Sequence, residues 1–103
     1  MKEVKFLGNS IDNIRKFSKN AQDDLGYQLH RVQTGAEPDN WKPMNSIGSG
    51  VKEIRTNVAE GTYRTIYIAK IGNKIYVLHA FKKKTEKTAK EDIELAKKRL
   101  KEI

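Results

Sequence analysis

Cysteine is absent from the 103 residues of the chain, and histidine occurs only twice. Without cysteine there is no disulfide and no thiolate metal site, and nothing indicates an oxidising compartment. Two separate histidines, with no paired carboxylates in the basic half of the chain, lack the spacing of a metal site. Glycine patterns of the Walker or dinucleotide-binding kind are missing as well. Any chemistry that this sequence supports is therefore predicted to need no metal and no cofactor.

Long apolar runs are also missing. The first ten residues, MKEVKFLGNS, contain no stretch typical of a signal peptide, and no segment is apolar enough to span a bilayer. The expected compartment is the cytoplasm, and no membrane anchoring is expected. A length of 103 residues predicts one domain, residues 1–103, which can build a single core without metals or disulfides.

Positive charge is concentrated in one part of the chain. The formal net charge of +8 arises from 21 lysines and arginines against 13 aspartates and glutamates. Residues 1–41 and 91–103 are each neutral overall, whereas residues 42–81 and 82–90 each carry a net charge of +4. Such a one-sided field indicates a polyanionic partner, such as nucleic acid, an acidic protein or a membrane surface. The alternative is a solvated, lysine-rich face.

The first third of the chain predicts a strand followed by helix. Lys2–Gly8 alternates charged and apolar residues, as a short strand at the edge of a sheet does. Ser10 is a candidate N-cap and Ser18 a second one, so one long helix and two helices broken near Phe17 are both compatible with the pattern. Gly35 ends it as a C′ glycine. The residues spaced three or four apart on one helical face are Ile11, Ile14, Phe17, Ala21, Leu25, Leu29 and Val32.

The middle of the chain predicts a loop and then three strands. Gly35–Gly50 holds both prolines and reads as a loop, which Trp41 is expected to pin onto the core. The three predicted strands are Val51–Val58, Thr62–Ile71 and Lys74–Lys82. Gly72-Asn73 is a two-residue hairpin signal, so the last two strands should pair antiparallel.

A C-terminal helix completes the prediction. Thr88 and Glu91 have the spacing of a capping box, with Thr88 as N-cap. The apolar stripe of this helix is Ile93, Ala96, Leu100 and Ile103. The resulting order predicts an α+β fold with a mainly antiparallel sheet and the helices on one face. The other face would then be free to form a polar, concave working surface.

Strand periodicity places several candidate site residues together. In the third predicted strand, Ile75, Val77, His79, Phe81 and Lys83 should point to one face, and Tyr76, Leu78, Ala80 and Lys82 to the other. Arg55 and Arg64 lie in mid-strand, where their planar donor groups suit phosphate. Each arginine has a structural alternative: Arg55 could pair with Glu53 or Glu60, and Arg64 with Glu53. His79 alone could be a hydrogen-bonded filler.

RNA cleavage fits this set of residues. RNA carries its own nucleophile, the 2′-hydroxyl, so cleavage needs proton transfer and stabilisation of charge on the phosphoryl oxygens. A histidine can transfer protons near neutral pH, clustered lysine and arginine can stabilise the charge, and an aromatic ring such as Phe81 can stack on a base. His30, in the predicted helix, carries no further signal.

Four segments resemble the RelE/ParE toxin superfamily, and more closely its phage-derived HigB-like branch. They are NWKPMNSIGSGVKEIR, GTYRTIYIAK, YVLHAFKKKTEKT and DIELAKKRL. The resemblance implies a RelE-like fold: a twisted, mainly antiparallel sheet with two N-terminal helices on one face and a C-terminal helix. It implies the toxin of a type II toxin–antitoxin system, whose partner is a helix-turn-helix antitoxin.

The resemblance also implies an activity. The RelE side of the superfamily inhibits translation by cutting mRNA on the ribosome, so an endoribonuclease (mRNA interferase) with ribosome and mRNA as partners is expected. The ParE side acts on DNA gyrase without cutting RNA and is the alternative. A nucleic-acid-binding or regulatory protein without toxicity is a third reading.

Site residues carry over one by one. Arg64 matches the arginine of the family's Gly-x-Tyr-Arg strand, Arg55 the basic position of the preceding strand, and Lys83 the basic residue just after the last strand. The expected catalytic residues are Arg64, His79 and Lys83, and the expected RNA-binding residues are Arg55, Phe81, Lys82 and Lys84. RelE has a tyrosine a few residues after the last strand, where this chain has Thr88-Ala89, so its role would pass to Phe81 and His79.

Overall fold

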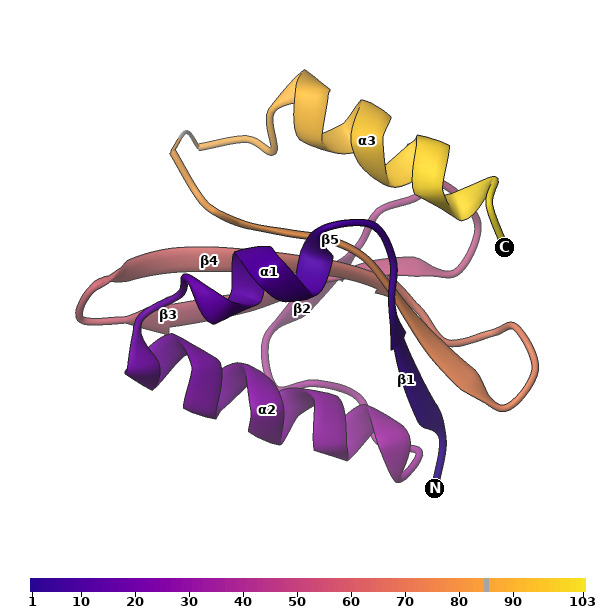
Figure 1. Cartoon of the computed structure of the whole chain (residues 1–103), viewed down its shortest axis with the longest axis horizontal. Coiled ribbons are helices and arrows are strands. Elements are labelled where there is room, and N and C mark those ends of the chain that lie inside the picture. The colour runs from indigo at the N-terminus through magenta and orange to yellow at the C-terminus, as the bar shows by residue number, and fades with distance from the viewer. Residues whose placement is uncertain (85) are drawn as a thin grey trace.

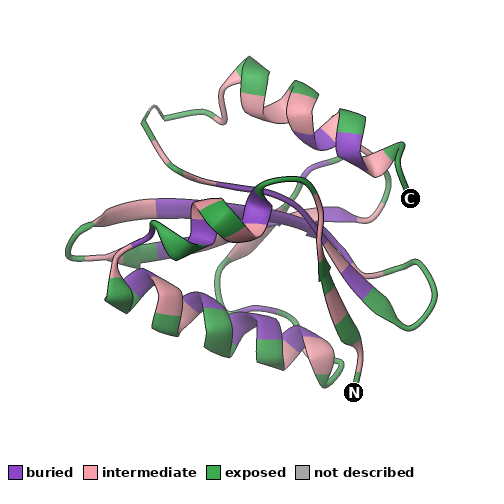
Figure 2. Cartoon of the chain, in the orientation of Figure 1, coloured by how far each residue is buried: buried purple, intermediate pink, exposed green. Residues whose placement is uncertain are grey.

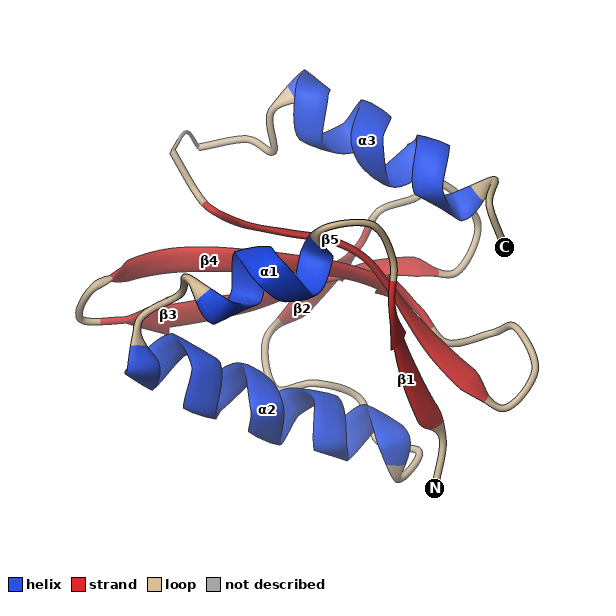
Figure 3. Cartoon of the chain, viewed as in Figure 1, coloured by secondary structure: helices blue, strands red, loops and turns tan. Residues whose placement is uncertain are grey.

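The chain forms a five-stranded sheet with three helices. A computed structural model describes residues 1–84 and 86–103. In chain order the elements are β1 (Glu3–Phe6), α1 (Ser10–Arg15), α2 (Lys19–Gln33), β2 (Trp41–Pro43), β3 (Val51–Val58), β4 (Gly61–Ile68), β5 (Lys74–Lys82) and α3 (Lys90–Leu100) (Figure 3). The predicted α+β class is confirmed.

The strands follow the order β1-β5-β4-β3-β2 across the sheet. β2, β3, β4 and β5 pair antiparallel, and β1 joins β5 in parallel, with Val4 opposite Ile75. The sheet is therefore mainly antiparallel, and the first strand lies at its edge, both as predicted. β3 and β5 have the predicted bounds. β4 ends at Ile68, three residues before the predicted end, so residues 69–73 replace the expected two-residue turn.

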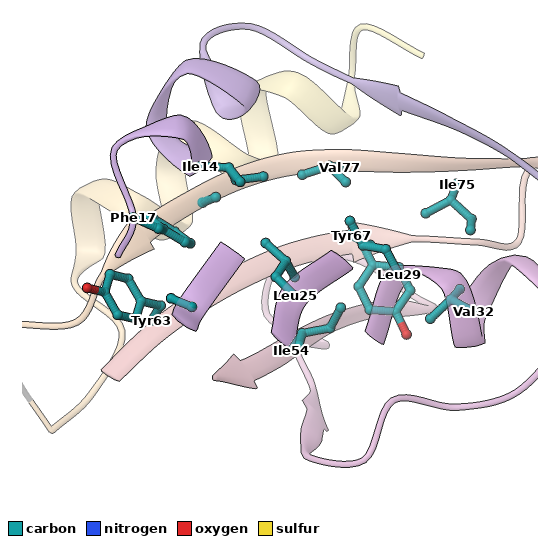
Figure 4. Close-up of a cluster of buried hydrophobic side chains, with 12 residues drawn as sticks. Ile14, Phe17, Leu25, Leu29, Val32, Ile54, Tyr63, Tyr67, Ile75 and Val77 are labelled. Atoms are coloured by element: carbon teal, nitrogen blue, oxygen red, sulfur yellow. The ribbon is translucent and has the colours of Figure 1, made fainter. Parts of the chain in front are cut away.

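Two hydrophobic clusters lie on opposite faces of the sheet. One joins α1 and α2 to the sheet, and Figure 4 shows Leu25 and Leu29 against Tyr67 and Ile54. The other places Ala96 of α3 against sheet residues of the opposite face, such as Ile66. The prediction that all helices cover one face is therefore wrong: α1 and α2 lie on one side and α3 on the other (Figure 1). Burial on both faces explains why β4 is almost continuously buried (Figure 2).

Caps divide the N-terminal helical region into two helices. The Ser18 hydroxyl accepts a hydrogen bond from the Ala21 N–H at 3.2 Å, so Ser18 is the N-cap of α2, as one of the two alternatives required. Ser10 is not a cap, because Asn9 occupies that position and Ser10 is already helical and buried. At the other end, Gly35 has a φ of +94° and donates to the Val32 carbonyl, which confirms the C′ glycine.

A β-bulge changes the orientation of side chains in β5. Ile66 pairs with His79, but the next residue, Tyr67, pairs with Val77, so Leu78 has no partner in β4. Leu78 and His79 therefore both face α3, whereas Val77 belongs to the cluster under α1 and α2. The prediction that Val77 and His79 share a face is wrong, because strict alternation does not hold across a bulge.

The segment before α3 does not form the predicted capping box. The N-cap is Ala89, without a side-chain hydrogen bond, and α3 begins at Lys90. The Thr88 hydroxyl instead donates to a Glu53 carboxylate oxygen at 2.7 Å. Ile103 lies beyond the end of the helix and is exposed, so it does not extend the apolar stripe.

Arg99 anchors the C-terminal part of α3. Its side chain is buried, and it donates to the Leu78 carbonyl at 2.9 Å and to the Asn9 side-chain oxygen at 2.6 Å. Burial lowers the pKa of this guanidinium, an effect that Glu102 partly opposes. Since Leu78 is the bulged residue, Arg99 ties α3 to the bulge and to the start of α1.

The predicted loop of residues 35–50 contains the short strand β2. Trp41 pairs with Ile54 of β3, and the Lys52 ammonium lies 4.5 Å from the centre of a Trp41 ring. Trp41 therefore holds this segment at the edge of the sheet, as predicted. It does so through strand pairing, which the prolines and glycines of the segment did not predict.

Gly26→Ala should stabilise the protein by about 0.5–1 kcal/mol, because glycine in a helix interior is that much less favourable than alanine. Gly26 lies in α2, is exposed, and has no atom within 4 Å of an added Cβ. The matched control is Gly35→Ala, where the space is equally open but the φ of +94° disfavours a side chain. Thermal melting should show a higher midpoint for the first variant and a lower one for the second. Equal shifts in both would contradict the explanation.

Candidate functional site

A lysine-lined cleft opens where β5 ends. Its volume is about 520 Å³, and its walls come from the end of α1, from β4 and β5, and from the start of α3. The lining cations are Lys16, Lys82, Lys83, Lys84 and Lys87, against two carboxylates, Glu91 and Asp92. An excess of positive charge in a concave site attracts and holds anions. We call this site the lysine cleft.

The geometry of β5 explains how three consecutive lysines enter the cleft. The backbone N–H of Lys83 donates to the Thr62 carbonyl at 2.8 Å, which extends the pairing with β4 just past the end of the strand. The Lys82 ammonium lies 5.8 Å from the centre of the Tyr63 ring, on the side of α1 and α2. Lys82 and Lys84 are exposed and Lys83 is half-buried. All three of these predicted residues therefore reach the cleft.

His79 lies behind the cleft and does not line it. Its side chain is stacked on Phe81, with 5.1 Å between ring centres, and only 4% of the residue is exposed. Nε2 of His79 lies 2.7 Å from Oδ1 of Asp92, and Nδ1 is buried with no hydrogen-bond partner among the described residues. Phe81 and Asp92, in contrast, both line the cleft. The predicted histidine thus reaches the cleft only through these two neighbours.

Arg64 belongs to a buried ionic cluster next to the cleft. It is opposite Phe81 in the pairing of β4 with β5, and 5% of it is exposed. Its Nε lies 3.3 Å from Oε1 of Glu53, and its Nη1 donates to the Tyr63 carbonyl at 3.2 Å. Burial lowers the pKa of the Arg64 guanidinium; the charge of Glu53 raises it and that of Arg55 lowers it further.

Glu53 is the centre of that cluster. It is completely buried, and its Oε1 also lies 4.0 Å from Nε of Arg55, while Oε2 accepts the Thr88 hydrogen bond. One carboxylate therefore faces two guanidinium groups. The pairings of Glu53 with Arg55 and Arg64 are the structural alternatives that the sequence left open. The described contacts thus place Arg55 and Arg64 in an ion-pair cluster and Phe81, Lys82, Lys83 and Lys84 in the cleft.

Sequence reasoning missed Asp92 and Lys16. Asp92 lies in the first turn of α3, where an acidic residue is favourable for any helix because it offsets the helix dipole. Lys16 is the C-cap residue of α1, which packs on the face of the sheet opposite α3. Neither has a local signal, because the contact of each with the cleft depends on how α1 and α3 flank the end of β5.

Among the residues that the structure describes, no three histidine, cysteine, aspartate or glutamate side chains gather as metal ligands would. None of the described helices is both long and apolar enough to cross a membrane.

Comparison with models of protein families gives a match over most of the chain. Residues 12–101 match the family described as "Phage derived protein Gp49-like (DUF891)". This range contains all three helices in full or in part, the strands β2 to β5, and every residue of the lysine cleft and of the Glu53 cluster. No curated protein matches the chain.

Proposed function

Because the chain belongs to the family of phage-derived Gp49-like proteins, we propose that it is the toxin of a type II toxin–antitoxin pair and cuts mRNA on the ribosome. The family is one of toxin-like proteins of such systems. The observation that carries the nuclease proposal is the lysine cleft, in which five lysines face two carboxylates beside an aromatic ring. RNA phosphates and an unstacked base match this combination of charge and ring.

The proposed reaction is attack of the 2′-hydroxyl on the adjacent phosphate. Lys82 and Lys84, the exposed lysines, bind flanking phosphates, and Phe81 offers a ring for stacking. Lys83, half-buried at the end of β5, gives a proton to the leaving 5′-oxygen and offsets charge on the phosphoryl group. The roles are assigned by solvent exposure. Water screens the charge of a half-buried ammonium less than that of an exposed one, so Lys83 interacts more strongly with charge on the phosphoryl group.

Arg64, Arg55 and His79 act from behind the cleft in this proposal. Arg64 and Arg55 share the single carboxylate of Glu53, so their cluster keeps an excess positive charge beside Phe81. That charge stabilises the extra negative charge of the transition state and holds nearby RNA phosphate. His79 acts through Asp92, with which it shares a hydrogen bond.

The partner proposed for the free toxin is a helix-turn-helix antitoxin. An acidic segment of such a partner would neutralise the lysine cleft and block RNA there. Charge complementarity of this kind is weakened by salt, so loss of the complex at about 0.5 M salt is expected if charge dominates the contact.

Induction of this protein alone in a bacterial host should stop translation within minutes. Labelled amino-acid incorporation measures the effect, and primer extension on mRNA should show new 5′ ends within coding regions. The control is co-expression with the proposed helix-turn-helix antitoxin, which should restore incorporation. Continued protein synthesis with arrested DNA synthesis would instead indicate action on gyrase, and new 5′ ends would then be absent.

A further inference from the structure

Asp92 is the acidic group that connects the lysine cleft to the buried histidine. It lies in the first turn of α3, and 22% of its side chain is exposed. Its Oδ1 takes the hydrogen bond of His79 at 2.7 Å, and the same side chain lines the cleft together with Lys83. A substrate in the cleft therefore meets the carboxylate of Asp92, whereas it meets neither nitrogen of His79.

We infer that Asp92 is a catalytic residue that removes the proton of the attacking 2′-hydroxyl, and that His79 is the positioning residue behind it. This inference rests on the proposed nuclease function and names the base of that reaction. The hydrogen bond from His79 Nε2 fixes the orientation of the carboxylate in the cleft wall. A general base needs such an orientation as well as reach.

The step balances without any further reactant. The 2′-O–H proton passes to the Asp92 carboxylate while the 2′-oxygen forms a bond to phosphorus. The bond from phosphorus to the 5′-oxygen breaks, and that oxygen takes a proton from the Lys83 ammonium. The products are a 2′,3′-cyclic phosphate and a 5′-hydroxyl end, and exchange with water returns one proton to Lys83 and removes one from Asp92.

A purely structural role for Asp92 would be to tie α3 to β5. Arg99 already supplies that connection through its hydrogen bond to the Leu78 carbonyl, and it also donates to Asn9 before α1. Thr88 adds a third link, from the segment before α3 to Glu53. α3 is thus held at both ends by contacts that do not involve Asp92, and the carboxylate stands in the cleft rather than among the buried side chains of the helix.

The test compares Asp92→Asn, His79→Gln and the matched control Glu94→Gln in single-turnover cleavage of ribosome-bound mRNA. Asp92→Asn should lower the rate by about 10²–10⁴-fold, the usual loss for a proton-transfer group. His79→Gln keeps an N–H donor near the position of Nε2 and should stay within about tenfold of wild type. Glu94→Gln removes an equal charge from the same helix but outside the cleft, and it should cut at a rate close to wild type.

Ribosome co-sedimentation and thermal melting show whether each variant still binds and folds. If Asp92→Asn melts early, Asp92→Ala with added formate is measured instead, because only a missing base is rescued by a small carboxylate. A folded Asp92 variant that cuts at the wild-type rate overturns the inference and leaves the proposed nuclease intact. Loss of activity in His79→Gln equal to that of Asp92→Asn also overturns it, since His79 would then carry the proton itself. A wild-type protein that does not cut overturns both proposals.

Discussion

Replacing Glu53 with alanine should lower the free energy of unfolding by about 3–5 kcal/mol, because it leaves a buried guanidinium without its counter-charge. Glu53 is fully buried, and its Oε1 lies 3.3 Å from Nε of Arg64, which is itself 5% exposed. The change also removes the acceptor of the Thr88 hydroxyl, which holds the segment before α3. Urea denaturation followed by circular dichroism measures the loss.

The matched control is Glu37→Ala. Lys52 Nζ lies 2.6 Å from a carboxylate oxygen of Glu37, a shorter contact than that of Glu53 with Arg64, but Glu37 is exposed. A solvent-exposed ion pair contributes only about 0–1 kcal/mol, so this variant should be nearly as stable as wild type. Similar losses in both variants would show that contact distance, and not burial, determines the stability.

A double variant separates the structural role of the pair from its charge. Glu53→Leu with Arg64→Met replaces two buried charges by apolar groups of similar size and should recover most of the stability lost in Glu53→Ala. The double variant should nevertheless lose RNA cleavage, because it lacks the Arg64 guanidinium opposite Phe81, although Arg55 leaves the net charge of the cluster unchanged. Recovery of both stability and cleavage would remove Arg64 from the proposed reaction.

The strands could be predicted because their signals are local. β3 and β5 have the predicted bounds, since each alternates or runs apolar next to turn residues such as Gly50 and Gly72, both with positive φ in the structure. β2 was missed because a strand of three residues that itself ends in Pro43 carries no periodicity of its own. β2 forms because Trp41 pairs with Ile54 of β3, a residue distant in the sequence.

The side of the sheet on which α3 packs could not be predicted from its sequence. Its stripe, with Ala96 at the centre, fits either face equally well, and the face is decided by sheet residues that point away from α1 and α2, such as Ile66 and Leu78. The bulge at Leu78 then turns His79 toward α3. Both effects are non-local, and together they explain why Asp92 did not appear among the predicted site residues.

The lysines, in contrast, were visible from the sequence. Lys82, Lys83 and Lys84 are consecutive and follow directly after a buried strand, so they must leave the sheet together and reach solvent at one place. Arg64 was visible as a mid-strand cation, but its ion pair with Glu53 depends on the register of β3 with β4, in which Glu53 lies opposite Ile66 and Arg55 opposite Arg64. This register places Glu53, Arg55 and Arg64 on one face of the sheet, where they form the ion pairs that the sequence offered only as a structural alternative.

Lys83→Ala should lower the single-turnover cleavage rate by about 10²–10⁴-fold while ribosome co-sedimentation stays close to wild type. Lys83 is the half-buried lysine of the three and lines the same cleft as the proposed base. Lys82→Ala or Lys84→Ala should instead weaken ribosome association and reduce the slope of log K against log salt by about one unit per lost phosphate contact. Lys98→Ala is the control, because Lys98 is exposed on α3 and outside the cleft.

Lys83→Arg decides between charge and proton transfer. Arginine keeps the positive charge and binds phosphate well, but its guanidinium does not give up a proton in proteins. If Lys83 protonates the leaving oxygen, Lys83→Arg should bind ribosomes normally and cut as slowly as Lys83→Ala. If Lys83 only offsets charge, Lys83→Arg should cut at nearly the wild-type rate, and the acid must then be another group. Both variants should melt at the wild-type temperature, because neither change removes the hydrogen bond from the Lys83 backbone N–H to the Thr62 carbonyl. Melting curves therefore test whether unfolding causes any loss of activity.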